Sequence, residues 1–326
     1  MISTYRRILT MLAIACFALG FAACGDDDKE DKSSADTKSA EGGKAIARDP
    51  ANASKGTITV GSKNFTEQFI LGEIYAQTLE AQGFKIKRRL NLGSEQVAYK
   101  ALKGGDVDMY PEYTGTALTS FFKVKVADVP KDSDAAYEQA KGDYAENGIT
   151  ALQRTPFENT YVIASTKETA EKAGNPKTVT ELMEKNPKLS ISGFPECRQR
   201  ADCLIGLRDT YGFKGKFISS DGKFNDLDGK QSELTLAFGT DPQILQTDKY
   251  VTYEDDKGLF PPYNITLGVG DDTVKTIGPK AVQTLEAVQE GMTVPAMREL
   301  NRRVELEKEQ PKDVAAAYLK EENFVE

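Results

Sequence analysis

The sequence of 326 residues contains no histidine and no tryptophan. Without histidine, the chain cannot use imidazole for acid–base or triad catalysis, nor for binding metal ions. Without tryptophan, it has no indole fluorescence with which to report on a bound ligand. Cysteine is also scarce, with four residues in the whole chain. Because this leaves few soft ligands, we expect neither a metal site nor a cofactor.

Acidic residues outnumber basic ones, with 50 Asp and Glu against 42 Lys and Arg and a net charge of −8. Loss of residues 1–23 would remove Arg6 and Arg7 and no acid, which would bring the net charge to −10. Binding to nucleic acid is not expected, because a basic face supplies most of the affinity in such complexes. A cationic solute suits this charge better.

The first residues have the pattern of a secretory signal. A pair of arginines precedes an apolar run over residues 8–23, which is too short to span a bilayer and is followed by acidic residues. The run ends in Ala22-Ala23-Cys24, which resembles the lipobox of bacterial lipoproteins. The resemblance implies that residues 1–23 are removed and that Cys24 holds the protein to the outer side of the cell membrane through a lipid. A plain signal peptide cleaved near Ala23 remains the alternative.

Residues 24–56 are rich in Asp, Lys, Ser, Ala and Gly and contain almost no aliphatic or aromatic side chains. Such a segment cannot bury enough apolar surface to fold. We therefore predict a flexible tether between the membrane and the folded part.

Two cysteines remain in the rest of the chain, Cys197 and Cys203, and they lie six residues apart. In an exported chain this spacing favours a local disulfide. The closed loop is short, so we expect the bond to stabilise the protein by about 2 kcal/mol.

The folded part begins with alternating strand and helix patterns, which predict a parallel, doubly wound α/β sheet. Strands are expected at 57–61, 85–90 and 107–110, and helices between them, the second over 94–102. A second α/β series follows, with a helix over 204–211 capped by Gly212 and strands at 161–164, 189–192, 234–238 and 250–254.

Residues 260–265 have the pattern of a crossing back to the first lobe, and the tail after Pro279 is helical in pattern. We predict two α/β lobes, one made of residues 57–161 and 264–326 and the other of residues 162–263, with the chain crossing between them twice. This is the organisation of a hinged ligand-binding protein, whose lobes close on the ligand.

The stretch Gly105–Thr116 combines two tyrosines, three carboxylates and a hydroxyl-rich turn. Pro111 has no N–H, and we expect it to end the pairing of the strand before it. Tyr113 then stands where strand gives way to helix, at a carboxyl end of the sheet, which is where open α/β sheets bind ligands.

Three motifs together resemble the substrate-binding proteins of glycine betaine/choline ABC importers: Gly61–Gln68, Tyr110–Thr116 and Phe260–Tyr263. The resemblance extends from about residue 57 to residue 324. It implies the two-lobed type II periplasmic-binding-protein fold, a quaternary ammonium ligand such as glycine betaine, choline, carnitine or proline betaine, and the membrane subunits of an ABC importer as partner.

The resemblance also implies the site residues. Aromatic rings would hold the quaternary ammonium group, which has no N–H to donate, through their negative faces. Polar donors would hold the carboxylate, and an arginine can offer two at once. The rings would be those of Tyr113, Tyr161, Phe238 and Tyr263, and the donors would be Lys63, Thr116 and Arg200.

Several positions depart from the family pattern. Phe238 stands where a tyrosine is usual, and Asn159 stands where an acid is usual. Arg198 lies close to Arg200, so it is an alternative for the carboxylate. Because two buried cations without a counter-charge would repel each other, we expect zwitterions to bind better than choline.

Two other functions compete with this interpretation. A receptor of the same fold could bind another amine, an amino acid or a sulfonate, and a lipid-anchored transferase or hydrolase could use Glu67, Asp108 and Glu112 as acid and base. The enzyme hypothesis lacks a nucleophile motif and a histidine. We therefore favour a binding protein that is not an enzyme.

Overall fold

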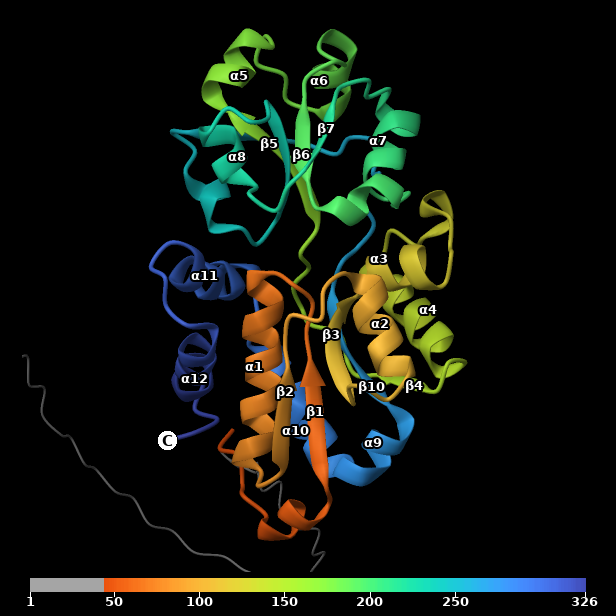
Figure 1. The fold of residues 1–326 in the computed structure, drawn as a ribbon, viewed down its shortest axis with the longest axis vertical. Coiled ribbons are helices and arrows are strands. Elements are labelled where there is room, and N and C mark those ends of the chain that lie inside the picture. The colour runs from red at the N-terminus through yellow and green to blue at the C-terminus, as the bar shows by residue number, and fades with distance from the viewer. Residues whose placement is uncertain (1–43) are drawn as a thin grey trace, which may run out of the picture. The chain divides into compact units, whose positions relative to one another are not determined.

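The computed structural model describes residues 44–326, which form two five-stranded sheets with helices on their faces (Figure 1). The expected signal peptide, Cys24 and most of the expected tether lie outside the described residues. The prediction that the tether extends to residue 56 is wrong for residues 44–56, which pack on the folded part. Ile46 donates its N–H to the carbonyl of Phe324 (2.8 Å), and the buried Asn52 side chain donates to the carbonyl of Gln82 (2.9 Å).

The first sheet has the strand order β2-β1-β3-β10-β4. Strand β1 is parallel to β2 and β3, whereas β10 is antiparallel to both of its neighbours. The sheet is therefore mixed, and not purely parallel as predicted, because a strand from the end of the chain is inserted into it. The strands are β1 Thr57–Gly61, β2 Lys85–Arg89, β3 Met109–Tyr113, β4 Ile149–Ala151 and β10 Ile265–Gly270.

The expectation that Pro111 ends strand pairing is wrong. Strand β3 continues through Pro111 to Tyr113, and Pro111 pairs in register with Leu267 of β10. On the other side, β1 meets β3 only at the pair Val60–Met109. Beyond this pair β3 has a neighbour on one side only, and a residue without an N–H is tolerated at such an edge.

The second sheet repeats the pattern of the first, with the order β7-β6-β8-β5-β9. Strand β6 is parallel to β7 and β8, and β5 is antiparallel to β8 and β9. In each sheet, the strand that follows a crossing is thus the one inserted antiparallel. The strands are β5 Tyr161–Thr166, β6 Ile191–Gly193, β7 Phe217–Ser219, β8 Leu234–Phe238 and β9 Tyr250–Tyr253.

Helices cover both faces of the first sheet (Figure 1). Helix α1 packs against α10, α11 and α12 on one face, and α2, α4 and α9 lie on the other. These helices are α1 Thr66–Ala81, α2 Glu95–Lys103, α3 Thr114–Thr116, α4 Ser133–Ala145, α9 Asp271–Ile277, α10 Pro279–Glu290, α11 Val294–Glu305 and α12 Pro311–Glu321. The second sheet carries α5 Lys167–Lys172, α6 Val179–Lys185, α7 Leu204–Tyr211 and α8 Phe224–Asp228. Among all these helices, none is both long and apolar enough to cross a membrane.

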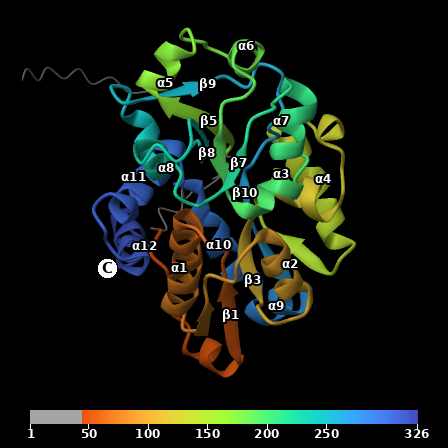
Figure 2. The same ribbon diagram turned by 45° about the horizontal axis from the view of Figure 1, so that its top comes forward.

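Two crossing segments join the sheets, residues 152–160 and 254–264. They run side by side, since Asn159 donates its N–H to the carbonyl of Tyr263 (3.1 Å) and Glu158 bridges Asn264. Helix α11 provides a third contact, because it reaches the second sheet's loops near α8 (Figure 2). Two adjacent crossings are the kind of connection found at the hinges of two-lobed proteins.

Candidate functional site

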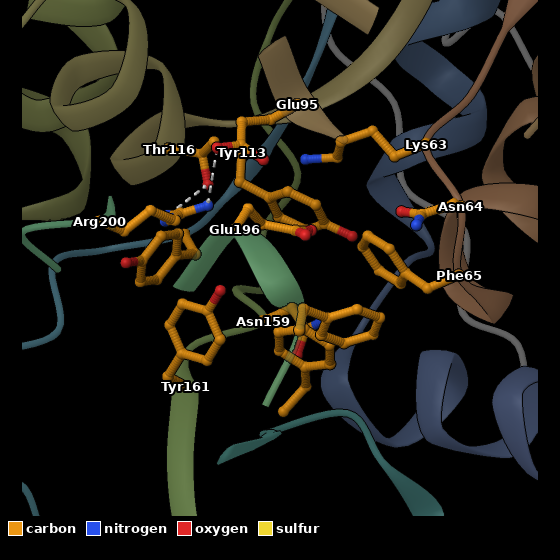
Figure 3. Close-up of a pocket in the computed structure, with 13 residues that line it drawn as sticks. Lys63, Asn64, Phe65, Glu95, Tyr113, Thr116, Asn159, Tyr161, Glu196 and Arg200 are labelled. Atoms are coloured by element: carbon orange, nitrogen blue, oxygen red, sulfur yellow. Dashed lines mark hydrogen bonds and ion pairs between the residues drawn. The ribbon is translucent and has the colours of Figure 1, made fainter. Parts of the chain in front are cut away.

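A cavity of about 40 Å³ lies between the two sheets, next to the crossings (Figure 3). All seven side chains assigned to the ligand from the sequence line it. Six further residues, which sequence reasoning did not assign, complete its wall. The full lining is Lys63, Asn64, Phe65, Glu95, Tyr113, Thr116, Asn159, Tyr161, Phe194, Glu196, Arg200, Phe238 and Tyr263.

Each element delivers its side chain at a strand end. Tyr113 is the last residue of β3, Phe238 is the last of β8, and Tyr161 is the first of β5. Tyr263 comes from the second crossing, two residues before β10. The four rings therefore converge because the strands that carry them end or begin at the same gap between the sheets.

The cavity contains two more rings than the sequence analysis assigned. Phe65 lies 6.1 Å from Tyr113 and 5.4 Å from Phe238 between ring centroids, and Phe194 lies 5.9 Å from Phe238. Tyr161 lies 5.2 Å from Phe238 and 5.6 Å from Tyr263. Phe65 stands inside the quoted motif Gly61–Gln68, which could have drawn attention to it. Phe194 is recognisable only as the residue that follows β6.

Hydrogen bonds fix two of the tyrosines by their hydroxyl groups. Tyr113 donates to Glu67 (2.8 Å), and Tyr263 donates to Asp202 (2.6 Å). Burial, together with these carboxylates, raises the pKa of both phenols well above the usual value. Both phenols are therefore neutral hydrogen-bond donors, and these bonds fix the orientation of their rings beside the cavity.

Glu67, in the first turn of α1, ties the surroundings of the cavity together. Its carboxylate accepts from Tyr113 and Asn159 (2.9 Å) on one oxygen and from Thr240 (2.5 Å) and Asn301 (3.1 Å) on the other. Burial raises the pKa of Glu67, and these hydrogen bonds oppose the rise. The four donors come from β3, a crossing, the loop after β8 and α11, so one carboxylate joins both sheets.

Asn159, which departs from the family pattern, is part of this network. Its side-chain N–H donates to Glu67, and its side-chain oxygen accepts from the backbone N–H of Thr240 (3.2 Å). An acid at this position would place a second carboxylate against the buried Glu67. The neutral amide is the side chain that both neighbours can satisfy.

Lys63 follows β1 and is buried, with its ammonium group bonded to Glu112 of β3. The same ammonium lies 4.4 Å from the ring centroid of Tyr113. Burial lowers the pKa of Lys63 and raises that of Glu112, and the attraction between the two groups opposes both shifts. Lys63 thus reaches the cavity with a partner of its own.

Arg200 is 8% exposed and makes two hydrogen bonds to Asp202 (2.6 and 2.8 Å) and one to Thr116 (3.2 Å). Burial acts to lower the pKa of Arg200, but Asp202 more than offsets burial, and the pKa lies well above its usual value. Arg198 does not line the cavity. It donates to Ser219 and to the carbonyl of Phe217 instead.

The premise that two cations would face the ligand without counter-charges is therefore wrong. Glu112 balances Lys63, and Asp202 balances Arg200. The two acids were visible in the sequence, but only the fold brings Glu112 beside Lys63, 49 residues away.

The structure joins Cys197 and Cys203 in a disulfide. The bond spans the loop that carries Arg200, which follows a short 3-10 helix over Pro195–Gln199. The disulfide therefore restricts the segment that brings the guanidinium to the cavity.

The arrangement suits binding of a small cation with a polar end. Six aromatic side chains line the cavity together with Thr116, Lys63 and Arg200, which supply a hydroxyl, an ammonium and a guanidinium group. Within residues 44–326, no group of three or more Cys, Asp and Glu side chains is placed to hold a metal ion.

Comparisons of the sequence and of the structure with known proteins point to the same family. Residues 56–321 match the family described as the substrate binding domain of ABC-type glycine betaine transport systems. A glycine-betaine-binding protein of Pseudomonas aeruginosa is 30% identical over 285 residues, which cover 83% of this chain and 89% of that protein. The solved structure of apo YehZ from Escherichia coli superposes with a TM-score of 0.60 at 29% identity and covers 82% of this chain and 98% of that one.

One relative has a different ligand in its name. The ergothioneine transport permease/ergothioneine binding protein EgtU of Helicobacter pylori is 30% identical over 267 residues, which cover 80% of this chain. The matched part is only 47% of that protein, so this chain spans about half the length of that relative.

Proposed function

Because the chain belongs to the family of substrate-binding domains of ABC-type glycine betaine transport systems, we propose that it is an extracytoplasmic receptor for a small quaternary ammonium compound. Glycine betaine, or a related osmoprotectant such as choline, carnitine or proline betaine, would occupy the cavity. The receptor would then deliver it to the membrane subunits of an ABC importer.

The observation that carries this proposal is the set of six rings around the cavity: Phe65, Tyr113, Tyr161, Phe194, Phe238 and Tyr263. A trimethylammonium group cannot donate a conventional N–H hydrogen bond, whereas desolvated contacts with aromatic faces are worth up to roughly 2 kcal/mol each. Arg200, Lys63 and Thr116 would hold the carboxylate of glycine betaine by hydrogen bonds.

Titration calorimetry with purified protein tests this function, since the chain has no tryptophan to follow by fluorescence. We expect saturable one-to-one binding of at least one trimethylammonium compound among glycine betaine, choline, carnitine and ergothioneine, the last included because of the Helicobacter pylori relative. A neutral amino acid of similar size is the control. Tighter binding of the amino acid than of every trimethylammonium compound would contradict the proposal.

We also propose that no reaction follows binding. The lining contains no histidine and no cysteine, and the amine of Lys63 is bonded to Glu112. Prolonged incubation should return the ligand unchanged by NMR, and the appearance of a product would refute this part.

The two sheets would act as lobes that close on the ligand, with residues 57–161 and 264–326 in one lobe and residues 162–263 in the other. Within residues 44–326, the covalent links between them are the two adjacent crossings. Ligand should therefore lower the radius of gyration in small-angle scattering, and an unchanged radius at saturation would count against closure. We further propose that Cys24 carries the lipid anchor.

A further inference from the structure

Two carboxylates in the cavity wall have no role in the binding of glycine betaine. Glu95 is the first residue of α2, on the first sheet, and Glu196 lies in the short 3-10 helix after β6, on the second sheet. Both line the same cavity as the six rings (Figure 3). Glycine betaine offers its carboxylate to the polar part of the site, and that group would repel both acids.

The neighbouring cations are already engaged with other acids. Lys63 is bonded to Glu112, and Arg200 makes its two short hydrogen bonds to Asp202. The nearest guanidinium nitrogen of Arg200 is 3.9 Å from Glu95, which is too long for a hydrogen bond. Throughout the described chain, no side chain donates a hydrogen bond to Glu95 or Glu196. Together with Glu112 and Asp202, which lie behind the lining, the site therefore has four acids for its two cations.

Glu95 is only 4% exposed, so its charge is largely removed from bulk water. A buried carboxylate without a hydrogen-bond donor is costly and is expected to have a partner. Burial also raises the pKa of the Glu196 carboxyl, and the nearby charge of Glu95 adds to the rise, whereas Arg200 and Lys63 oppose it. The burial of Glu95 and the lack of a side-chain donor to either acid leave room for a ligand group that would donate to both.

The two acids also stand at the opening of the cavity. Glu95, Glu196 and Arg200 line both the cavity and an adjacent groove of about 780 Å³. The groove also contains two lysines, Lys123, whose ammonium donates to the carbonyl of Ser120, and Lys125. A ligand whose head sits among the rings can thus extend past the two carboxylates into open space.

We propose that Glu95 and Glu196 form a second subsite that takes the far end of the ligand, and that this end carries a positive charge or a hydrogen-bond donor. This inference rests on the proposed function, because it assumes a quaternary ammonium head among the rings. The substrate class is then a trimethylammonium compound with an amine or a hydroxyl at its other end. The preference for zwitterions expected from the sequence would be reversed.

The physical reason is electrostatic. The acids come from different sheets, so bringing the sheets together forces two like charges toward each other at low dielectric. A cationic or donor group between them removes that repulsion and satisfies both carboxylates, whereas a ligand carboxylate adds a third negative charge. Selectivity then depends on the repulsive element as much as on the attractive one.

Calorimetry with three ligands that share one head separates the charge at the far end from the contribution of the rings. The ligands are (2-aminoethyl)trimethylammonium, choline and glycine betaine, which end in an ammonium, a hydroxyl and a carboxylate. The wild-type protein should bind the first two more tightly than glycine betaine. Glu196→Gln and Glu95→Gln keep the shape of each side chain and remove its charge. Each should weaken the aminoethyl compound about tenfold or more and choline about threefold, and leave glycine betaine unchanged or tighter.

Glu171→Gln, on the exposed surface of α5, is the matched control and should leave all three affinities unchanged. Thermal unfolding of each variant verifies that the fold is retained. Equal weakening of the three ligands by Glu196→Gln and Glu95→Gln, or no effect on any of them, would overturn the subsite while leaving the proposed function intact. If the wild-type protein binds carnitine or ergothioneine but none of these three, the subsite alone is wrong, and if it binds no trimethylammonium compound at all, the proposed function is wrong as well.

Discussion

Tyr161 is the ring whose contribution to binding can be isolated most cleanly, because its hydroxyl donates no hydrogen bond to any other described residue. Tyr161→Ala should weaken a trimethylammonium ligand about tenfold, since one desolvated cation–π contact is worth roughly 1–2 kcal/mol. Tyr161→Phe keeps the ring and should change the affinity by less than about threefold. Calorimetry on both variants measures the difference. Equal losses in the two variants would show that the ring face is not what binds.

Arg200 and Arg198 are a matched pair two residues apart, of which only Arg200 lines the cavity. Arg200→Ala should weaken glycine betaine by more than tenfold and choline much less, because only betaine has a carboxylate for the guanidinium. Arg198→Ala should leave both affinities within about twofold. Calorimetry on the two variants makes the comparison. A larger loss of glycine betaine affinity in Arg198→Ala than in Arg200→Ala would show that Arg198, and not Arg200, binds the carboxylate.

The sequence predicted which side chains line the cavity, but not which acids pair with its lysine and arginine. Tyr113, Tyr161 and Arg200 line the cavity as expected, because motif residues at strand ends converge wherever such sheets face each other. The partnership of Lys63 with Glu112 and the approach of Glu95 to Glu196 depend on contacts between distant segments. Single-sequence patterns carry no information about such contacts.

Helix α3 packs so closely on the second crossing that only glycine fits at position 115. A Cβ on Gly115 would come within 2.7 Å of the carbonyl oxygen of Pro262 and 2.9 Å of the ring of Tyr263. Gly115→Ala should therefore displace the crossing and weaken ligand binding, although alanine normally stabilises a helix.

Gly142→Ala in α4 is the control, because nothing lies within 4 Å of the added carbon. There we expect the free energy of unfolding to rise by up to about 1 kcal/mol with ligand affinity unchanged. Urea unfolding and calorimetry measure the two quantities. If Gly115→Ala were as harmless as Gly142→Ala, the close packing of α3 on the crossing would be unimportant.

The disulfide closes the loop that carries Arg200. Cys197→Ser with Cys203→Ser should lower the free energy of unfolding by about 2 kcal/mol, as a short closed loop predicts. The double variant should also weaken glycine betaine, because the loop between the two positions becomes mobile. Urea unfolding measures the stability. Two free thiols in the wild-type exported protein, found by mass analysis without reductant, would contradict the bond itself.

The elements with strong local patterns were predictable. Strands β1 and β8 have the expected bounds, and α7 ends at Gly212, whose φ of 70° is the left-handed conformation that glycine adopts easily. The antiparallel insertion of β10 was not predictable, because the direction of a strand depends on its neighbours and not on its own sequence. The same holds for Pro111, whose position at an unpaired edge is a property of the sheet.

At the scale of the whole molecule, the proposed anchor can be tested without the ligand. Cys24→Ser removes the thiol that a lipid would modify, and we expect the protein to move from the membrane fraction to the soluble fraction. Fractionation followed by immunoblotting measures this. The control is Cys16→Ser, which lies inside the predicted signal and should leave the protein on the membrane. Firm membrane attachment of Cys24→Ser would rule out the lipid at this position.

The contact between Phe65 and Phe194, 6.1 Å apart between ring centroids, joins the two sheets across the cavity. The chain is spectroscopically silent at tryptophan wavelengths, so Phe194→Trp would install a single indole at this boundary. Its emission would depend on whether Phe65 or water lies against it, and hence on whether the sheets are together or apart. A single substitution would thus turn this protein into an optical sensor, in which binding of the solute shifts the wavelength of tryptophan emission.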